Sequence, residues 1–581
     1  MEVINKIKRL RKPNAPWHKF YKEGEREIKV ENRSIYEYLE KSVAIHSNLP
    51  AIEYFGKKTT YGNLMNEIEN CAKALKKIGI KQKDVVTICM ANMKEAIVTF
   101  YATNKIGAIA NMIHPLSAEE EIKNYLINNH TKLLVAIDMC YEKISSIIKQ
   151  TNVIKTILVS IKESMPIPLK IGYQITAGYK IKKPKKEEGY LSWRQFINLG
   201  CKEPKVETVK NGKDDPAVIL HSGGTTGDPK GIVLSNGNFN ALTEQAKIVF
   251  TRVEKGDSVL TILPLFHGFG LGVCTNTPLC FGAKVILVPK FNSREFDKLI
   301  KKTKPNLIMG VPTLYEALVN CKSEKNLNLS QIKYIISGGD CLQTKLNTKL
   351  NNYLKEHGCL EEISQGYGMT EALAATALAY DNVNKKGSIG IPFPGNYFKI
   401  IDPNTGKELG PNQDGEICIS GPTVMLGYLD NEVATNDVLR IHDDGYLWLH
   451  TGDIGYMDED GVFYYRQRLK RMIISSGYNV YPSYIENIIE QHPAVLSCTV
   501  IGVPHPYKVE VPKAFIVLKS GYIGINTKGS IKKFCEKHLS KHSIPHEFEF
   551  RKSLPKTLIG KVDFQKLMKE EEKKRKKENE K

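Results

Sequence analysis

A stretch rich in glycine, hydroxyl and lysine side chains directly follows an apolar run at residues 217–220. Glycines let the backbone wrap around an anion, while neighbouring N–H groups, hydroxyls and an ammonium supply donors and charge, so the stretch suits a polyphosphate. It is not a Walker A loop, which needs Ser or Thr directly after Gly-Lys, because Lys230 here lies between Pro229 and Gly231. The candidate phosphate-binding residues are Ser222, Gly223, Gly224, Thr225, Thr226, Gly227 and Lys230.

A second segment, at residues 365–371, combines an aromatic ring, glycines and a carboxylate. An aromatic face suits a purine, glycines allow close backbone approach, and a carboxylate suits a hard cation such as Mg²⁺. A heptapeptide of this kind in isolation is more often a tight turn, so its meaning depends on the other segments. It offers Gly366, Tyr367, Gly368, Thr370 and Glu371 as candidate site residues.

Both segments resemble motifs of the adenylate-forming superfamily, which includes acyl-CoA synthetases, luciferases and the adenylation domains of peptide synthetases. Further matching segments follow in the family's order, so the resemblance covers most of the chain. It implies that Tyr367 lies against adenine, that Thr370 lies near phosphate and that Glu371 holds Mg²⁺. It also implies catalytic roles for Thr226 and Glu371.

Two segments resemble the family's ribose clamp and hinge. The resemblance implies that Asp453, in Thr-Gly-Asp, accepts hydrogen bonds from the ribose hydroxyls. It further implies that Arg468 contacts ribose or phosphate and that Lys470 is the pivot of a domain rotation. The chain departs from the hinge pattern at Gln467, where glycine is common, and at Arg471, where an acid is common.

Two segments near the C-terminus resemble motifs that serve the two half-reactions. Residues 554–561 match the pattern P-[RK]-T-x-[ST]-G-K, except that Ile559 replaces the small hydroxyl residue. The resemblance implies that Lys561 bridges the substrate carboxylate and the α-phosphate during adenylation. It also implies that a loop within residues 475–482 faces CoA in the second step, with Ser476, Gly477 and Tyr478 at its tip.

Two segments concern the binding of the acyl substrate. Residues 263–270 and 337–340 resemble the floor and the wall of the family's carboxylate pocket. The resemblance assigns His267 to the floor, although packing is an equally good explanation for a histidine seen alone. Amino-acid adenylation domains carry an aspartate near the first segment, and its absence argues against α-amino acids. Residues 477–482 and 191–196 are most similar to fatty acyl-CoA synthetases.

Short apolar runs alternate with amphipathic stretches through the middle of the chain, which predicts parallel strands at 258–263, 283–288, 306–309 and 334–337. A helix, a strand pair and a second helix are expected between residues 34 and 77, and residues 163–204 are expected to form an irregular surface insertion. The predicted fold is a large α/β N-terminal domain, built from parallel-sheet subdomains and a small β-rich subdomain, with a smaller, mobile α+β C-terminal domain. The predicted boundaries are 1–468 for the AMP-binding N-terminal domain, 469–470 for the hinge, 471–566 for the C-terminal domain and 567–581 for a charged tail that is frayed or helical in solvent.

The net charge of +20 comes from lysines spread through the whole chain, with no nucleic-acid-binding motif beside them, so no nucleic-acid partner is expected. The twelve cysteines contain no C-x-x-C pair and suit reduced thiols. The N-terminus lacks an apolar signal segment, which predicts a cytoplasmic protein and leaves peripheral membrane contact open. The oligomeric state leaves no mark in the sequence.

These observations predict an acid-thiol ligase that uses ATP and Mg²⁺ to form an acyl-AMP and pyrophosphate, then transfers the acyl group to CoA. Medium or long fatty acids are the expected substrates. Two alternatives stay open: a ligase for aryl or other small carboxylates or for a carrier-protein thiol, and a non-catalytic basic binding protein on the same fold. The joint presence of Glu371, Asp453, Arg468 and Lys561 argues against the last, because a binding protein has no need of all four.

Overall fold

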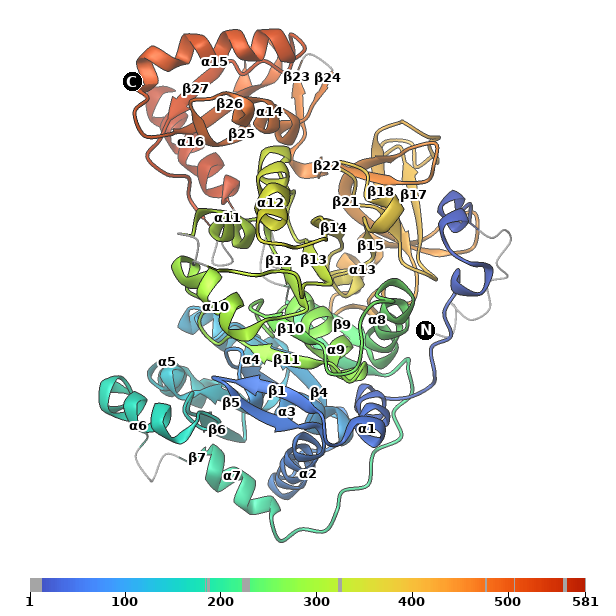
Figure 1. Ribbon diagram of the computed structural model, residues 1–581, viewed down its shortest axis with the longest axis vertical. Coiled ribbons are helices and arrows are strands. Elements are labelled where there is room, and N and C mark those ends of the chain that lie inside the picture. Colours follow the sequence, from blue (N-terminus) through green and yellow to red (C-terminus); the bar gives the residue numbers. More distant parts are fainter. Residues whose placement is uncertain are drawn as a thin grey trace.

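A computed structural model of the chain describes residues 13–182, 184, 189–221, 230–321, 326–475, 478–505, 507–556 and 562–579. A large N-terminal body contains two mainly parallel sheets and a smaller antiparallel sheet, and a compact C-terminal unit with its own sheet lies at one end of the molecule (Figure 1). This arrangement confirms the predicted α/β class with a smaller α+β unit. No helix in the described ranges combines the length and the apolar composition needed to cross a bilayer.

An eight-stranded sheet flanks the candidate phosphate loop. Its central strands are parallel, but β8 and β9 run antiparallel, with His221 opposite Gly231. Residues 222–229 therefore join two neighbouring strands rather than a strand and a helix. The strand order is β19 (Gly427–Tyr428), β9 (Gly231–Ser235), β8 (Pro216–His221), β4 (Ile109–Met112), β3 (Val85–Cys89), β5 (Thr131–Ile137), β6 (Lys155–Val159) and β7 (Tyr190–Ser192).

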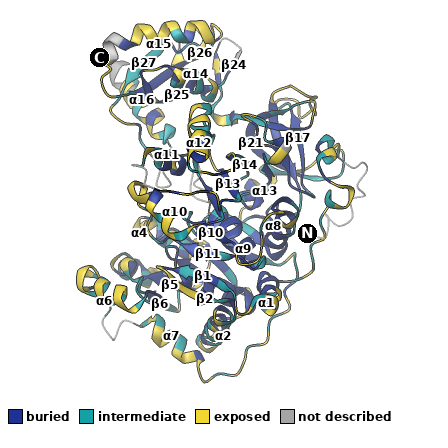
Figure 2. Cartoon of the chain, in the orientation of Figure 1, coloured by how far each residue is buried: buried dark blue, intermediate teal, exposed yellow. Residues whose placement is uncertain are grey.

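A nine-stranded sheet carries the second motif, because β14 ends at Tyr367. Its six central strands are parallel and mostly buried, which confirms the predicted alternation in the middle of the chain (Figure 2). The order is β16 (Ile391–Pro392), β15 (Ala377–Leu378), β14 (Ser364–Tyr367), β13 (Tyr334–Ser337), β12 (Leu307–Gly310), β10 (Ser258–Thr261), β11 (Lys284–Leu287), β1 (Pro50–Tyr54) and β2 (Lys57–Thr60).

Helices pack on these sheets through apolar stripes. In α2, Leu64, Ile68, Ala72 and Leu75 are buried as predicted, and Gly79 ends the helix in the left-handed region at φ 96°. The helices of the body are α1 (Ile35–His46), α2 (Tyr61–Ile78), α3 (Lys94–Lys105), α4 (Glu119–Asn128), α5 (Tyr141–Ile147), α6 (Ile167–Thr176), α7 (Trp193–Gly200), α8 (Asn236–Val249), α9 (Thr277–Cys280), α10 (Phe296–Thr303), α11 (Pro312–Asn320), α12 (Thr344–Glu356) and α13 (Glu432–Val438).

The stretch at residues 163–204 is more regular than predicted. Strand β7 extends the eight-stranded sheet beside β6, and α7 packs against α2. Helix α7 begins with a capping box between Ser192 and Gln195. Its last residue, Gly200, lies so close to α2 that an added Cβ would be 2.6 Å from the carbonyl oxygen of Asn70. Only part of this stretch is therefore an irregular excursion.

The antiparallel sheet of the body contains β17 (Tyr397–Ile401), β18 (Gly415–Ser420), β21 (Leu447–Met457), β20 (Leu439–Ile441) and β22 (Phe463–Arg468). It matches the predicted β-rich subdomain, and its last strand ends at Arg468. A short 3₁₀ turn, Leu469–Arg471, connects it to the sheet of the C-terminal unit. That unit contains β23 (Ile473–Ser475), β24 (Tyr478–Val480), α14 (Pro482–Gln491), β25 (Val495–His505), β26 (Val509–Leu518), α15 (Gly524–His538), β27 (Glu547–Phe550) and α16 (Phe564–Asn579).

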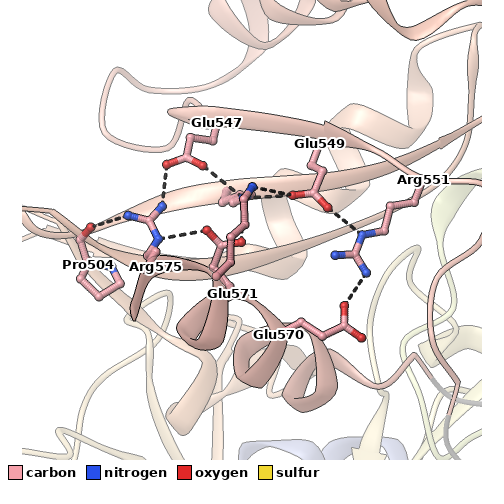
Figure 3. Close-up of polar contacts among 9 residues, drawn as sticks. Pro504, Glu547, Glu549, Arg551, Glu570, Glu571 and Arg575 are labelled. Atoms are coloured by element: carbon pink, nitrogen blue, oxygen red, sulfur yellow. Dashed lines mark hydrogen bonds and ion pairs between the residues drawn. The ribbon is translucent and has the colours of Figure 1, made fainter. Parts of the chain in front are cut away.

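The charged tail is helical, which agrees with one of the two predicted forms, but the helix packs on the C-terminal unit instead of lying free in solvent. Helix α16 contacts β25, and its Leu567 is fully buried. A network of charged side chains joins α16 to the sheet, and Figure 3 shows Glu571 and Arg575 of α16 beside Glu547 and Glu549 of β27. At its centre is Lys513 of β26, which is only 2% exposed. The Nζ atom of Lys513 lies 2.8 Å from Glu571 of α16 and 3.1 to 3.2 Å from Glu549 and Glu547 of β27. Sequence composition could not reveal this partner because β26 and α16 are distant along the chain.

Candidate active site

Four segments meet at the candidate nucleotide site: the end of β14, the start of β9, strand β19, and the paired strands β21 and β22. Tyr367 donates a hydrogen bond from its hydroxyl to Oδ2 of Asp453, at 2.7 Å. The guanidinium of Arg468 lies 3.0 Å from Oδ1 of Asp453 and donates to the carbonyl oxygen of Thr451 at 3.2 Å. Three predicted residues from motifs up to a hundred positions apart therefore form one cluster.

The Asp453 carboxyl is almost fully buried, and burial raises its pKa. Arg468 and Tyr367 oppose that shift by charge and by hydrogen bonding. Burial acts to lower the pKa of Arg468, but the neighbouring Asp453 raises it, so the guanidinium stays charged. A carboxylate held in this way suits a ligand that donates hydroxyl protons, since such donors offset the remaining cost of burial.

Glu371 lies in the turn after β14 and is also buried. Its Oε1 atom accepts a hydrogen bond from the Tyr428 hydroxyl at 3.0 Å. The Nζ atom of Lys230, from the phosphate-loop motif, lies 4.6 Å from the centre of the Tyr428 ring. Tyr428 therefore connects the two motifs, because β19 pairs with β9 and brings the ring between them. A buried carboxylate oxygen beside a phosphate-binding motif fits a Mg²⁺ ligand.

The backbone around Glu371 is tightly constrained. Leu373 and Ala374 both have positive φ angles, 51° and 69°, which cost energy for residues with a Cβ atom. A Cβ atom on Gly368 would lie 1.9 Å from the carbonyl oxygen of Ala374, so only glycine fits there. Thr370 begins the turn that holds Glu371. This strain is typical of a segment positioned for a ligand.

His267 lies directly before a π-helical stretch, Phe269–Asn276, a form that is frequent at functional sites. The segment contacts the strained turn, because an added Cβ on Gly268 would be 3.3 Å from the Cβ of Ala374. The structure therefore brings the predicted carboxylate-pocket segment against the nucleotide motif.

An apolar cavity lies beside this contact, and Ala374 is among the residues that line it. Side chains of α8, including Leu242 and Phe250, line one part of it, and Phe269 of the π-helical stretch lines another. Gly366 and Tyr367 of the nucleotide motif also line the cavity. An apolar ligand in the cavity would therefore have one end next to the nucleotide site.

The two departures from the hinge pattern have different surroundings. Arg471 belongs to the C-terminal unit, where its Nη2 atom lies 2.5 Å from Oε1 of Glu486 and donates to the carbonyl oxygen of Val500 at 3.2 Å. Gln467 is fully buried on β22, and its side-chain amide makes no hydrogen bond with any described residue. Lys470 lies in the 3₁₀ turn between the two sheets. The predicted pivot therefore occupies the covalent link between the body and the C-terminal unit.

Several predicted residues lie outside the described residues. They are Ser222, Gly223, Gly224, Thr225, Thr226, Gly227, Ser476, Gly477 and Lys561. The backbone of Tyr478 forms the first residue of β24. The roles of Tyr478 and of the residues outside the described ranges stay predictions.

Sequence analysis missed two residues at this site. Tyr428 carried no signal, because its function depends on a strand pairing between distant segments. Glu416 of β18 accepts a hydrogen bond from the backbone N–H of Gly452 at 2.8 Å and lies 3.0 Å from Nδ1 of His450. Through these contacts Glu416 holds the backbone that directly precedes Asp453.

Comparison with known proteins agrees with this geometry. The chain matches the family model of the AMP-binding enzyme over residues 39–429 and that of the AMP-binding enzyme C-terminal domain over residues 484–561. It is 33% identical to a long-chain-fatty-acid–CoA ligase of Bacillus subtilis (strain 168), over 94% of this chain and 96% of the relative. It is 35% identical to a probable 4-coumarate–CoA ligase of Dictyostelium discoideum, over 78% of this chain and 79% of the relative.

Two solved structures are also similar to this chain over most of their length. The anthranilate CoA ligase AuaEII in complex with anthranoyl-AMP superposes with a TM-score of 0.80 at 25% identity, covering 93% of this chain and 98% of that one. ATP-bound MatB from Rhodopseudomonas palustris gives a TM-score of 0.79 at 25% identity, covering 92% and 98%. Since the family model spans more than half of the chain and the clustered residues come from its motifs, this chain belongs to the AMP-binding enzyme family.

Proposed function

We propose that this chain is an ATP-dependent carboxylate–CoA ligase whose acid is a medium or long fatty acid. The observation that carries the proposal is the shared wall between the apolar cavity and the nucleotide motif, at Gly366 and Tyr367. A fatty acid whose chain fills the cavity would present its carboxylate to the nucleotide. The similarity over nearly the full chain to a long-chain-fatty-acid–CoA ligase supports the same substrate class.

In the first step, a carboxylate oxygen of the acid attacks the α-phosphorus of ATP, and the bond to the bridging oxygen breaks to release pyrophosphate. Asp453 would accept hydrogen bonds from the ribose hydroxyls, while Arg468 holds Asp453 and neutralises nearby negative charge. Lys230 and residues 222–227 would bind the phosphates, and Lys561 would orient the attacking carboxylate. Glu371 would hold Mg²⁺, which neutralises phosphate charge when bound.

In the second step, the CoA sulfur attacks the acyl carbonyl, the bond to AMP breaks, and the thiol proton is released. We assign the N-terminal domain to 1–468 and the hinge to 469–470, and we extend the C-terminal domain from the predicted 471–566 to residue 579, so that it includes α16. Rotation about Lys470 would bring residues 476–478 to the site for this step. The substrates ATP and CoA and the twelve unpaired cysteines suit a cytoplasmic enzyme.

The alternative of a ligase for aryl or small carboxylates is favoured by the 4-coumarate–CoA ligase relative and by the anthranilate ligase structure. The cavity gives the means to separate the two substrate classes. Ala246 is buried on α8 and lines it, so Ala246→Phe would fill part of the space that a long chain needs.

The test is acyl-CoA formation by wild type and Ala246→Phe with butyrate, benzoate and palmitate. The proposal predicts palmitate as the best wild-type substrate and at least a tenfold loss of palmitate turnover in the variant, with butyrate turnover retained as the control for folding. A wild type that prefers benzoate, or a variant that retains palmitate turnover, would contradict the proposed substrate.

A further inference from the structure

Helix α6 is the most apolar surface element in the described part of the chain, and none of its residues is buried. Its side chains Ile167, Ile171 and Ile175 are 73%, 57% and 70% exposed. Leu169 and the nearby Tyr179 are exposed as well. The helix lies at the outer edge of the molecule, next to α5 (Figures 1 and 2). Five large apolar side chains are thus exposed within thirteen residues, and folding of this chain does not bury them.

The helix has a defined inner and outer face. Tyr173 packs against the main hydrophobic core, and Gln174 accepts a hydrogen bond from Lys162. Ile167, Ile171 and Ile175 follow at intervals of four residues and form one stripe, which points about 160° away from Tyr173 at roughly 100° per residue. The contact of Tyr173 with the core therefore fixes α6 with its isoleucine stripe directed outward.

The sequence around α6 has an excess of positive charge, although Glu163, Glu187 and Glu188 border it. Residues 164–186 contain six lysines and no acidic residue, and four of the lysines fall within residues 182–186. Lys180 and Lys182 are exposed beside the helix, and Lys182 also pairs with Glu142 of α5. A basic segment adjoining a short exposed apolar stripe matches the chemistry of an anionic lipid surface, which offers both acyl chains and negative head groups.

We propose that α6, with Lys180 and Lys182 beside it, forms a docking site for an anionic lipid bilayer. The isoleucine stripe enters the boundary between head groups and acyl chains, while the lysines contact lipid phosphates and carboxylates. The helix lies parallel to the membrane plane, since ten residues are too few to span it. A lipid surface fits better than a second copy of this chain, because two copies meeting at α6 would bring their lysines together. The docking does not depend on the proposed ligase activity.

The test is sedimentation of the full-length protein with vesicles, without ATP, CoA or fatty acid. One set of vesicles is pure phosphatidylcholine, and the other contains about one third phosphatidylglycerol. The key variant is Ile167→Ser/Ile171→Ser/Ile175→Ser. Its matched control is Ile45→Ser/Leu360→Ser/Val433→Ser, which removes three equally exposed apolar side chains elsewhere on the surface. A third variant, Lys180→Gln/Lys182→Gln, tests the charge.

We expect wild type and the control to bind the anionic vesicles, and the isoleucine variant to lose at least tenfold in partition coefficient. The lysine variant should lose about fivefold per lysine at low salt. Equal binding by wild type and the isoleucine variant, or equal binding of wild type to both kinds of vesicle, would overturn the proposal. A dimer that dissociates in the isoleucine variant, with no vesicle binding by wild type, would assign the patch to self-association instead. Unchanged melting temperatures and turnover of a water-soluble acid establish that the variants are folded.

Discussion

At the scale of single residues, the site depends on polar contacts between motifs rather than within them. Tyr367, Asp453 and Arg468 form one cluster, while Glu371 and Lys230 meet through Tyr428. The motif residues could be predicted because their types match the chemistry of their ligands. Tyr428 could not, because a tyrosine between Gly427 and Leu429 carries no chemical signature until β19 pairs with β9.

The contact between Tyr428 and Glu371 gives a direct prediction. Tyr428→Phe removes a hydrogen bond to a carboxylate, which is worth about 1.5–3 kcal/mol. We expect about a tenfold loss in kcat/KM for adenylation and a changed Mg²⁺ dependence, both measured by pyrophosphate release. Tyr464→Phe is the control, because its hydroxyl bonds to Asp458 at 3.3 Å away from the cluster. Identical Mg²⁺ titrations of Tyr428→Phe and wild type would contradict the proposed role of Glu371.

Substitution of Lys561 should affect the two half-reactions differently. Lys561→Ala should remove most adenylation, because the attacking carboxylate loses its orienting charge, and should spare thioester formation from supplied acyl-AMP. Both steps can be measured separately by pyrophosphate release and by acyl-CoA formation. An equal loss in both would refute the assignment of Lys561 to the first step.

At the scale of elements, periodicity and turn residues predicted most strands and helices of the core. The predicted strand at 334–337 matches β13, and the buried face of α2 matches residue by residue. A short 3₁₀ helix, Ser293–Glu295, precedes α10, and the side chain of Asn292 caps it by accepting a hydrogen bond from the backbone N–H of Arg294. The pairing of β1 with β11 and of β7 with β6 was not predicted, since it depends on contacts between distant segments.

The attachment of α16 can be tested through Lys513. Burial acts to lower the pKa of Lys513, but Glu571, Glu549 and Glu547 raise it, so the residue is charged in the folded protein. Lys513→Met leaves these carboxylates without their shared partner and should lower the free energy of unfolding of the C-terminal unit by about 3 kcal/mol. Urea denaturation of the full chain, followed by proteolysis at α16, measures the loss.

The control for that loss is Lys574→Met, because the half-exposed Lys574 lies 3.8 Å from Glu549. Its expected effect is within about 0.5 kcal/mol. Equal urea midpoints for the two variants would show that the network does not hold α16.

At the scale of the whole molecule, the body and the C-terminal unit touch through α12 and α14, where Lys345 donates to the carbonyl oxygen of Glu490 at 3.1 Å. Burial, with smaller contributions from the nearby Glu486 and Glu316, raises the pKa of the Glu490 side chain to about 7. Glu316 belongs to α11 of the body, so this effect depends in part on how the two units are arranged.

A raised carboxyl pKa makes the folded state bind a proton that the unfolded chain has already lost. The stabilisation is complete below the unfolded pKa of about 4.3 and is lost as the pH rises through about 7. Between about pH 5 and pH 8, wild type should therefore lose about 1–2 kcal/mol more stability than Glu490→Gln, as measured by urea denaturation. Glu356→Gln, at an exposed position of α12, should keep the wild-type slope. Parallel slopes for wild type and Glu490→Gln would contradict the expectation.

The role of the turn that joins the two units as a hinge can be tested with two substitutions of Lys470. Lys470→Pro fixes one backbone torsion in the proposed hinge and should keep adenylation while blocking thioester formation. Lys470→Ala keeps the torsional freedom and should support both steps. Unchanged overall turnover in Lys470→Pro would refute the hinge assignment.

The most direct test of the ligase function is pyrophosphate release with ATP, Mg²⁺ and a panel of carboxylic acids, with and without CoA. We predict release that requires a fatty acid and accelerates when CoA is added, because thioester formation clears the acyl-AMP from the site. No release with any acid, despite measurable ATP binding, would contradict the function and favour a non-catalytic binding protein.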